Sequence, residues 1–266
     1  MIRALALIPA AALVGLFAVG GSDARPQQEP DAGVPVPVDQ QEALIAAFAE
    51  QGVLVDPARG RIEVQASLCQ RYEPLEYLLI KQPEGKDHEA LLGCENLSAE
   101  ALNAAMLMLG VKKGENGKLI SVEPPPTLEE VRNGAATYTV ERATGDGFYI
   151  YVSWEIEQNG EVERYVYRAE DLVLNVRRES TYQRGKWVYL GSRFLKPHKD
   201  AEEFFAAEGE GNLVSLVYFS PPSHLLTGAD PAGDDQNVWY PNAWLLPPMG
   251  HPMTVVFTRE PIDPLP

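Results

Sequence analysis

Four consecutive polar residues, Lys86-Asp87-His88-Glu89, form the densest group of side chains in the sequence that could carry out chemistry. An imidazole beside carboxylates can act as a general base or bind a metal ion. The group lies at the start of a predicted strand, where neighbouring side chains point to opposite faces. We therefore do not expect His88 and Glu89 to share one proton or one metal ion, whereas Asp87 and Glu89, or Lys86 and His88, could share a face. The alternative is that one side chain anchors the loop while another is solvated.

Histidines elsewhere in the chain are few and scattered. The sequence has four, His88, His198, His224 and His251, and contains no HExxH or HxH motif. Because catalytic zinc usually takes three protein ligands, a metal site would need distant residues to converge. The candidates for such a site are His88, His251 and Asp235, and the sequence identifies no cofactor.

Cys69 and Cys94 are the only cysteines, and they lie at the ends of two predicted strands. If those strands are neighbours, the two Cβ atoms could come within the ~3.5–4.5 Å that a disulfide needs. We expect a structural disulfide between them. Redox catalysis is disfavoured because the sequence has no CxxC motif.

The segment from residue 227 to 242 combines acidic and aromatic side chains and is predicted to be a long loop. Its Asp230, Asp234, Asp235 and Asn237 offer the oxygen ligands that calcium prefers, but without EF-hand spacing, so a solvated acidic loop is the alternative. Trp239, Tyr240 and Trp244 are candidates for stacking on a ligand such as a sugar. Trp154 and Trp187 lie in predicted strands and are expected in the core.

The amino-terminal region has the pattern of an exported protein. Arg3 precedes an apolar run of 16 residues from Ala4 to Val19, which is shorter than the roughly 20 needed to span a bilayer. We expect residues 1–24 to be a signal peptide cleaved after Ala24, and an uncleaved anchor is the alternative. Residues 25–38 are rich in proline and predict a disordered tether. After cleavage no transmembrane segment is expected, and the mature protein is predicted to be periplasmic or secreted.

Charge limits the class of partner. The formal net charge is −16, and the leader holds one base and one acid, so the mature chain keeps this value. Such a surface repels phosphate backbones, which excludes nucleic acid as an expected partner. The expected partner is an extracytoplasmic ligand or protein of unknown identity.

Hydrophobic patterning predicts the elements that position these residues. Asp39 to Glu42 form a capping box for a helix that ends at Gly52, and Ser98 caps a second helix that ends at Gly110. Residues 61–68 alternate strictly between polar and apolar, which is typical of a half-buried strand. Asn159-Gly160 predicts a hairpin turn. We predict an α+β fold, with a largely antiparallel sheet on which the two main helices pack.

The remaining strands are predicted from short runs rich in β-branched and aromatic residues. They cover residues 75–81, 89–94, 135–141, 147–157, 161–167, 187–190, 213–219 and 253–258. Residues 127–133 have the pattern of an inserted helical turn.

The order of these motifs resembles the YdjY-domain proteins, which are exported bacterial proteins. The most specific part is Gly85-Lys86-Asp87-His88-Glu89 followed by the helical run 102–110, and the closing strands around residues 187–192 and 247–255 agree. The resemblance covers about residues 53–258. It implies the compartment and the domain extent, and it implies no activity. Chain length and the lack of an internal linker predict a single domain over residues 39–258, followed by a tail over 259–266.

The sequence leaves two functional hypotheses. The first is an exported, non-enzymatic module that binds a ligand or protein at the surface around His88 and the 227–244 segment. The second is a metal-assisted hydrolase that uses His88 with Glu89 or Asp87. The second requires His88 to meet further metal ligands in a concave site, whereas the first requires only an accessible surface.

Overall fold

The computed structural model describes residues 38–262. The predicted leader, residues 25–37 of the predicted tether and residues 263–266 lie outside the described residues. Within the described part the chain is mostly β, with four short α-helices, α1 (Val38–Glu50), α2 (Ala99–Met108), α3 (Leu128–Arg132) and α4 (Ala206–Gly209). Three single turns of 3₁₀-helix are η1 (Pro57–Arg59), η2 (Asp87–Glu89) and η3 (Ala169–Leu172).

The strands are short except for β2, β7, β8 and β17. In chain order they are β1 (Val53–Asp56), β2 (Arg61–Leu68), β3 (Tyr77–Lys81), β4 (Ala90–Cys94), β5 (Lys118–Ser121), β6 (Tyr138–Glu141), β7 (Gly147–Gln158), β8 (Glu161–Arg168), β9 (Val173–Asn175), β10 (Ser180–Thr181), β11 (Trp187–Tyr189), β12 (Phe194–Leu195), β13 (Phe204–Phe205), β14 (Asn212–Ser215), β15 (Leu226–Thr227), β16 (Trp239–Pro241) and β17 (Pro252–Thr258).

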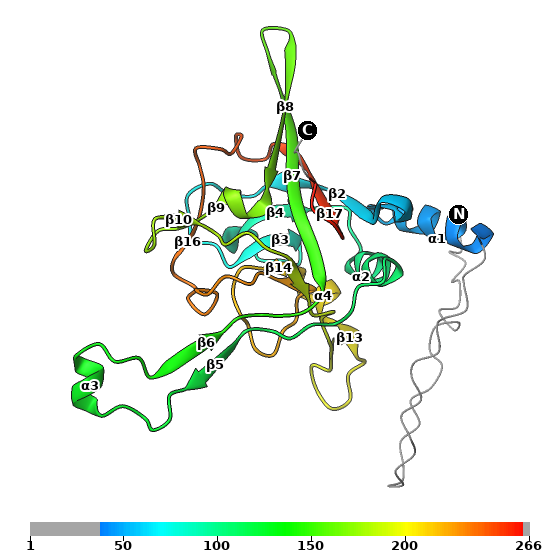
Figure 1. The fold of residues 1–266 in the computed structure, drawn as a ribbon. Helices are drawn as coiled ribbons and strands as arrows, with labels where there is room; N and C mark the ends of the chain where they lie inside the picture. The colour runs from blue at the N-terminus through cyan, green and yellow to red at the C-terminus, as the bar shows by residue number, and fades with distance from the viewer. Residues whose placement is uncertain (1–37, 263–266) are drawn as a thin grey trace. The chain divides into compact units, whose positions relative to one another are not determined.

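Eight of these strands close into a mixed barrel. Their order is β2-β17-β7-β11-β15-β14-β3-β4, and β4 pairs back onto β2. The pairs β14–β15 and β3–β4 are parallel, and the other six are antiparallel. In Figure 1, β7 passes beside β17 and β2 and then leaves the barrel to pair with β8. Ring closure gives each of the eight strands a neighbour on both sides.

Alternation along β2 places one of its faces in the core. Ile62, Val64, Ala66 and Leu68 are buried, whereas the intervening residues are half-buried or exposed. This period of two is the pattern that the sequence predicted for residues 61–68. By contrast, all five residues of β4 are buried, so both of its faces are covered.

Helix α2 begins where the sequence predicts. The Ser98 hydroxyl accepts a hydrogen bond from the Ala101 amide, and Gly110, at a φ of 76°, follows the last turn. Glu208 of α4 also accepts hydrogen bonds from the Ala99 and Glu100 amides, and it forms an ion pair with Lys81. A carboxylate from a distant helix therefore completes the amino-terminal cap of α2.

Two hairpins extend from the barrel. The β7–β8 hairpin turns at Asn159-Gly160, both with positive φ, as predicted. The second is a long arm formed by β5, α3 and β6, in which β5 and β6 pair only with each other (Figure 1). Helix α3 confirms the predicted helical turn, and Thr127 and Glu130 form its capping box.

The predicted fold class is correct only in part. The sheet is largely antiparallel and the two main helices lie at the predicted positions, where α1 and α2 pack beside β1. The fold is nevertheless mostly β, because the sheet closes into a barrel. Closure depends on the short β2–β4 pairing and on two parallel pairings, none of which leaves a local pattern in the sequence.

Candidate ligand-binding site

The cluster predicted from Lys86 to Glu89 lies on the surface. The side chains of Asp87 and His88 are 67% and 73% exposed. Lys86 Nζ donates to Glu89 Oε2 at 2.8 Å and to Glu76 Oε2 at 3.2 Å. The argument that His88 and Glu89 point apart is wrong, because His88 Nε2 lies 3.8 Å from Glu89 Oε1. Both belong to the 3₁₀ turn η2, which comes before β4 and does not alternate faces.

Glu76 is a member of this cluster that the sequence did not reveal. Its pKa is raised by burial and by contact with Glu89, although Lys86 opposes this change. Burial alone would raise the pKa of Glu89, but hydrogen bonds from Lys86 and Glu76 lower it. Lys86 therefore bridges two carboxyl groups whose pKa values are shifted in opposite directions, which is the pattern of a surface ion-pair network.

The three metal candidates do not come together. His251 Nε2 lies 2.9 Å from the Glu155 carbonyl oxygen, and the Asp235 carboxylate pairs with Arg177 at 2.6 Å. Among residues 38–262, no group of three or more histidine, cysteine, aspartate or glutamate side chains is arranged to hold a metal ion.

The predicted disulfide is wrong. Cys69 and Cys94 are both free thiols. Strands β2 and β4 are neighbours, but Ser67 pairs with Gly93 and Leu68 with Leu92, so Cys94 falls opposite Ala66, three positions from Cys69 and on the other face of the barrel wall. Burial raises the pKa of both thiols to about 12, which makes them poor nucleophiles.

The aromatic candidates divide between core and surface. Trp239 is fully buried in β16, where its ring centroid lies 4.6 Å from that of Tyr182, so it belongs to the core and not to an exposed loop. Tyr240 is half-buried. Trp244 is 94% exposed and is the one member of the three that is fully accessible to a ligand. Trp154 and Trp187 are buried, as predicted.

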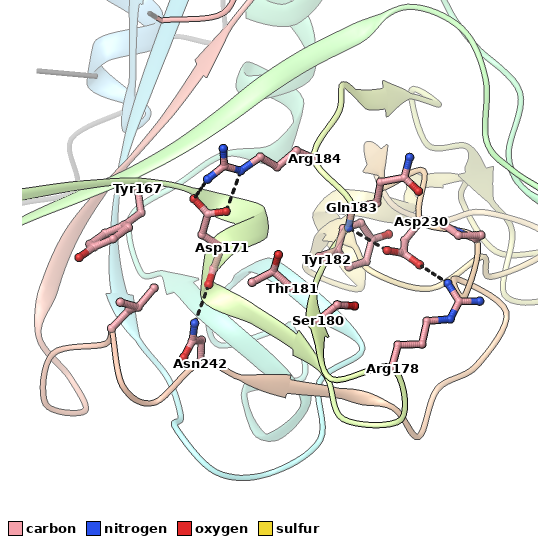
Figure 2. A pocket seen from close by; sticks show the side chains of 12 residues that line it. Tyr167, Asp171, Arg178, Ser180, Thr181, Tyr182, Gln183, Arg184, Asp230 and Asn242 are labelled. Carbon is pink, nitrogen blue, oxygen red and sulfur yellow. Dashed lines mark hydrogen bonds and ion pairs between the residues drawn. The ribbon is translucent and has the colours of Figure 1, made fainter. Parts of the chain in front are cut away.

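A cavity of about 610 Å³ opens beside the sheet formed by β10, β9 and β16. Figure 2 shows the side chains that line it, from β8, η3, β10 and the two segments that flank β16. The lining residues are Tyr167, Asp171, Arg178, Ser180, Thr181, Tyr182, Gln183, Arg184, Asp230, Pro231, Asn242 and Leu245. A volume of this size is typical of sites that bind small molecules.

Local turns position the polar residues of this cavity. The side chain of Asn175 accepts hydrogen bonds from the Arg177 and Arg178 amides, which reverses the chain between β9 and β10 and brings Arg178 to the rim. The pairing of Tyr240 with Leu174 brings the segment after β16 to the same rim. There the Asn242 side chain donates to the Asp171 carbonyl oxygen at 2.9 Å.

Both carboxylates of the cavity are engaged by hydrogen-bond donors. Arg184 binds Asp171 through two parallel hydrogen bonds of 2.8 and 2.7 Å, and this contact raises the pKa of Arg184. The Asp230 carboxylate accepts the amides of Gln183 and Ala232, each at 2.8 Å, and lies 3.8 Å from Arg178 Nη1. Figure 2 shows these two ion pairs on opposite sides of the cavity.

Comparison with known families identifies the chain. A family model of the YdjY domain matches residues 53–258. The chain belongs to the YdjY-domain family. Comparison with curated proteins and with solved structures gave no match. The matched range includes the whole lining of the cavity, so the cavity lies within the YdjY domain of this chain.

The side chains of this YdjY domain are suited to recognition. The hydroxyl groups of Ser180 and Thr181 line the cavity and have no hydrogen-bond partner within residues 38–262, whereas Tyr167 lines it with its ring (Figure 2). The two hydroxyl groups can donate to and accept from a ligand. The carboxylates, in contrast, already accept hydrogen bonds from donors of the protein.

Sequence reasoning missed most of this site. It identified Asp230 and the neighbourhood of Trp244 but not Asp171, Arg178 or Arg184. The polar run from residue 177 to 184 follows a very short strand and has no motif of its own. Only the pairing of β9 with β16, more than sixty residues later in the chain, assembles the YdjY cavity.

Proposed function

We propose that this YdjY domain is an exported, non-enzymatic binding module whose ligand occupies the cavity between β10, η3 and the segments that flank β16. The signal-peptide pattern of residues 1–24 supports export. One observation carries the binding assignment: Asp171 and Asp230 are held by donors, while the unpaired groups are hydroxyls. Such a lining fixes a ligand by hydrogen bonds and has no free base.

The hydrolase hypothesis gains no comparable support. Its candidate base, His88, is exposed on η2, and Lys86 already pairs with both neighbouring glutamates. Within the described range, His251 and Asp235 are held by partners of their own. These contacts therefore favour the binding module over the hydrolase.

Also within residues 38–262, no helix is both long and apolar enough to cross a membrane.

A library of small polar compounds tests the proposal. The chain is expressed with its leader, purified, and screened by saturation-transfer NMR against sugars, amino acids, nucleosides, dicarboxylates and polyamines. We expect at least one class to bind, and we expect binding to disappear in Thr181→Trp, because an indole at this exposed lining position fills the cavity.

The matched control is Thr139→Trp, an exposed threonine on β6 outside the cavity lining. It should bind as the unmodified protein does. Binding that survives Thr181→Trp would contradict the location of the site. Conversion of a bound compound to a product, seen as new resonances over time, would contradict the non-enzymatic assignment.

A further inference from the structure

Charge balance around the cavity disfavours ionic ligands. Two arginines and two aspartates line it, so its formal charge is zero. Arg184 and Asp171 satisfy each other, and Arg178 faces Asp230. An anion would also approach against the field of a chain with a net charge of −16, and a cation would meet the two guanidinium groups. These charges favour a neutral ligand.

The hydrogen-bonding groups that remain free match hydroxyl groups on the ligand. Ser180 and Thr181 each offer a donor and an acceptor. Asn242 uses its amide nitrogen on Asp171, so its carbonyl oxygen is left as an acceptor. Gln183 uses its carbonyl oxygen on Arg142, so its nitrogen is left as a donor. An alcohol group needs one donor and one acceptor at the same place, and this lining supplies both.

An aromatic ring of fixed orientation stands at one side of the cavity. The ring of Tyr167 stacks on Trp154 with a centroid distance of 5.4 Å and an interplanar angle of 20°. Tyr165 also stacks on Trp154, at 5.7 Å and 12°. Because Trp154 is buried, it holds both tyrosines in place. A ring held in this way is preorganised to pack against the C–H face of a sugar.

A second aromatic ring lies just outside the cavity. Asn242 and Leu245 both line the cavity, and the Leu245 amide donates to the Asn242 carbonyl oxygen at 3.0 Å, so Trp244 occupies a corner of the turn between them. Arg71 donates to the carbonyl oxygen of Ala243 at 2.7 Å and steadies this turn. An indole that is 94% exposed on a braced turn at a cavity rim marks a contact surface.

We propose that the ligand is a neutral oligosaccharide, with one sugar ring bound in the cavity against Tyr167 and a following ring packed on Trp244. This inference rests on the proposed binding function and specifies its ligand class. Two platforms, one inside and one outside the cavity, require a ligand longer than a single sugar. The hydroxyls of Ser180 and Thr181 and the amide of Asn242 would bind the ring inside the cavity.

Isothermal titration calorimetry on the full chain tests the inference with defined probes. The probes are cellotetraose, chitotetraose, maltotetraose, xylotetraose, mannotetraose, their four component monosaccharides (glucose, N-acetylglucosamine, xylose and mannose), and the anionic tetragalacturonate. We expect at least one neutral tetrasaccharide to bind more tightly than its monosaccharide. Trp244→Ala should weaken that tetrasaccharide about tenfold, as expected for the loss of one stacked ring worth about 1.4 kcal/mol. The same variant should leave binding of the monosaccharide unchanged.

Phe194→Ala is the matched control, because Phe194 is another exposed aromatic residue, 67% accessible, and does not line the cavity. It should change no affinity. Tighter binding of tetragalacturonate, equal affinity for a tetrasaccharide and its monosaccharide, or failure of all five neutral tetrasaccharides would each overturn the inference. If another compound class binds and is lost in Thr181→Trp, the binding function stands and only the carbohydrate class fails.

Discussion

His224 and Asp146 are ionisable side chains in opposite environments: within residues 38–262 His224 has no hydrogen-bond partner, whereas Asp146 has several donors. His224 is fully buried, and within the described part of the chain neither ring nitrogen has a hydrogen-bond partner. Burial lowers its pKa to about 3. Burial would raise the pKa of Asp146, but hydrogen bonds from Arg259, Lys112 and Gly147 outweigh it and lower the value to about 2. The histidine therefore stays neutral in the folded protein, and the aspartate stays charged.

Replacing His224 should make the protein more resistant to acid. The unfolded chain takes up a proton near pH 6.5 and the folded chain only near pH 3, so this group removes stability as pH falls between these values. Relative to wild type, His224→Leu should gain about 3 kcal/mol in free energy of unfolding between pH 6.5 and pH 4. Urea unfolding at four pH values in this range measures the difference.

The control is His198→Leu, since His198 is exposed. Its stability should follow that of wild type at every pH. Asp146 does not interfere, because its depressed pKa costs stability only between pH 3.8 and about pH 2. A His224→Leu curve parallel to wild type above pH 4 would show that the buried imidazole does not control the acid response.

At the scale of elements, the arm formed by β5, α3 and β6 differs from the rest of the fold. No residue from 118 to 141 is buried. Its root, however, is fixed: the Asn116 side chain donates to the Phe219 carbonyl oxygen at 2.8 Å, and a β-bridge joins Glu115 to Thr144. Gly117 packs so closely on Tyr218 that a Cβ there would come within 2.3 Å of the ring. Residues 115–117, at the base of the arm, are therefore fixed to the rest of the domain, whereas residues 118–141 contribute no buried side chain to the core.

Removing the arm should therefore leave the barrel intact. We expect a chain in which residues 118–141 are replaced by a four-residue Gly-Ser linker to lose no more than about 1 kcal/mol in free energy of unfolding, because surface changes are usually small. Thermal unfolding followed by circular dichroism measures this. Gly117→Val, at the root, should instead be strongly destabilising. A large loss in the armless chain would mean that the arm supports the barrel.

Local elements were predictable from the sequence where short-range physics decides them. The alternation over residues 61–68, the Ser98 cap and the Asn159-Gly160 turn each involve contacts within a few residues, and the structure confirms all three. Features that depend on register were not predictable. Cys69 follows β2 and Cys94 ends the neighbouring strand β4, yet a difference of three positions in the register puts them on opposite faces. The cavity is a similar case, because the β9–β16 pairing that builds it has no local pattern.

At the scale of the whole molecule, the barrel joins the beginning of the domain to its end. Strand β17 fills the gap between β2 and β7 and pairs with both over most of its length. Val255 and Phe257 of β17 are fully buried. Arg259, just after β17, binds Asp146 before β7 through two hydrogen bonds of 3.0 and 2.7 Å. Strand β17 thus joins the edge of β2 to the edge of β7 and also contributes buried side chains to the core.

Deletion of this segment should abolish cooperative folding. A chain that ends at His251 leaves the edges of β2 and β7 unpaired and exposes the core, so we expect no sigmoidal thermal transition and strong binding of a hydrophobic dye. A chain that ends at Ile262 should unfold as the full chain does, because Ile262 keeps its hydrogen bond to the Tyr151 hydroxyl at 2.8 Å. A normal transition in the shorter chain would contradict a closing role for β17.

Ring closure by the last strand also sets an order of events during synthesis. A ribosome releases β2 nearly two hundred residues before it releases β17, so throughout translation the nascent chain lacks the strand that completes its barrel. The barrel therefore stays incomplete until β17 has been synthesised. If the protein is exported as we propose, a secretion channel that threads unfolded polypeptides would accept this state, and the late position of β17 would leave time for export before the barrel closes.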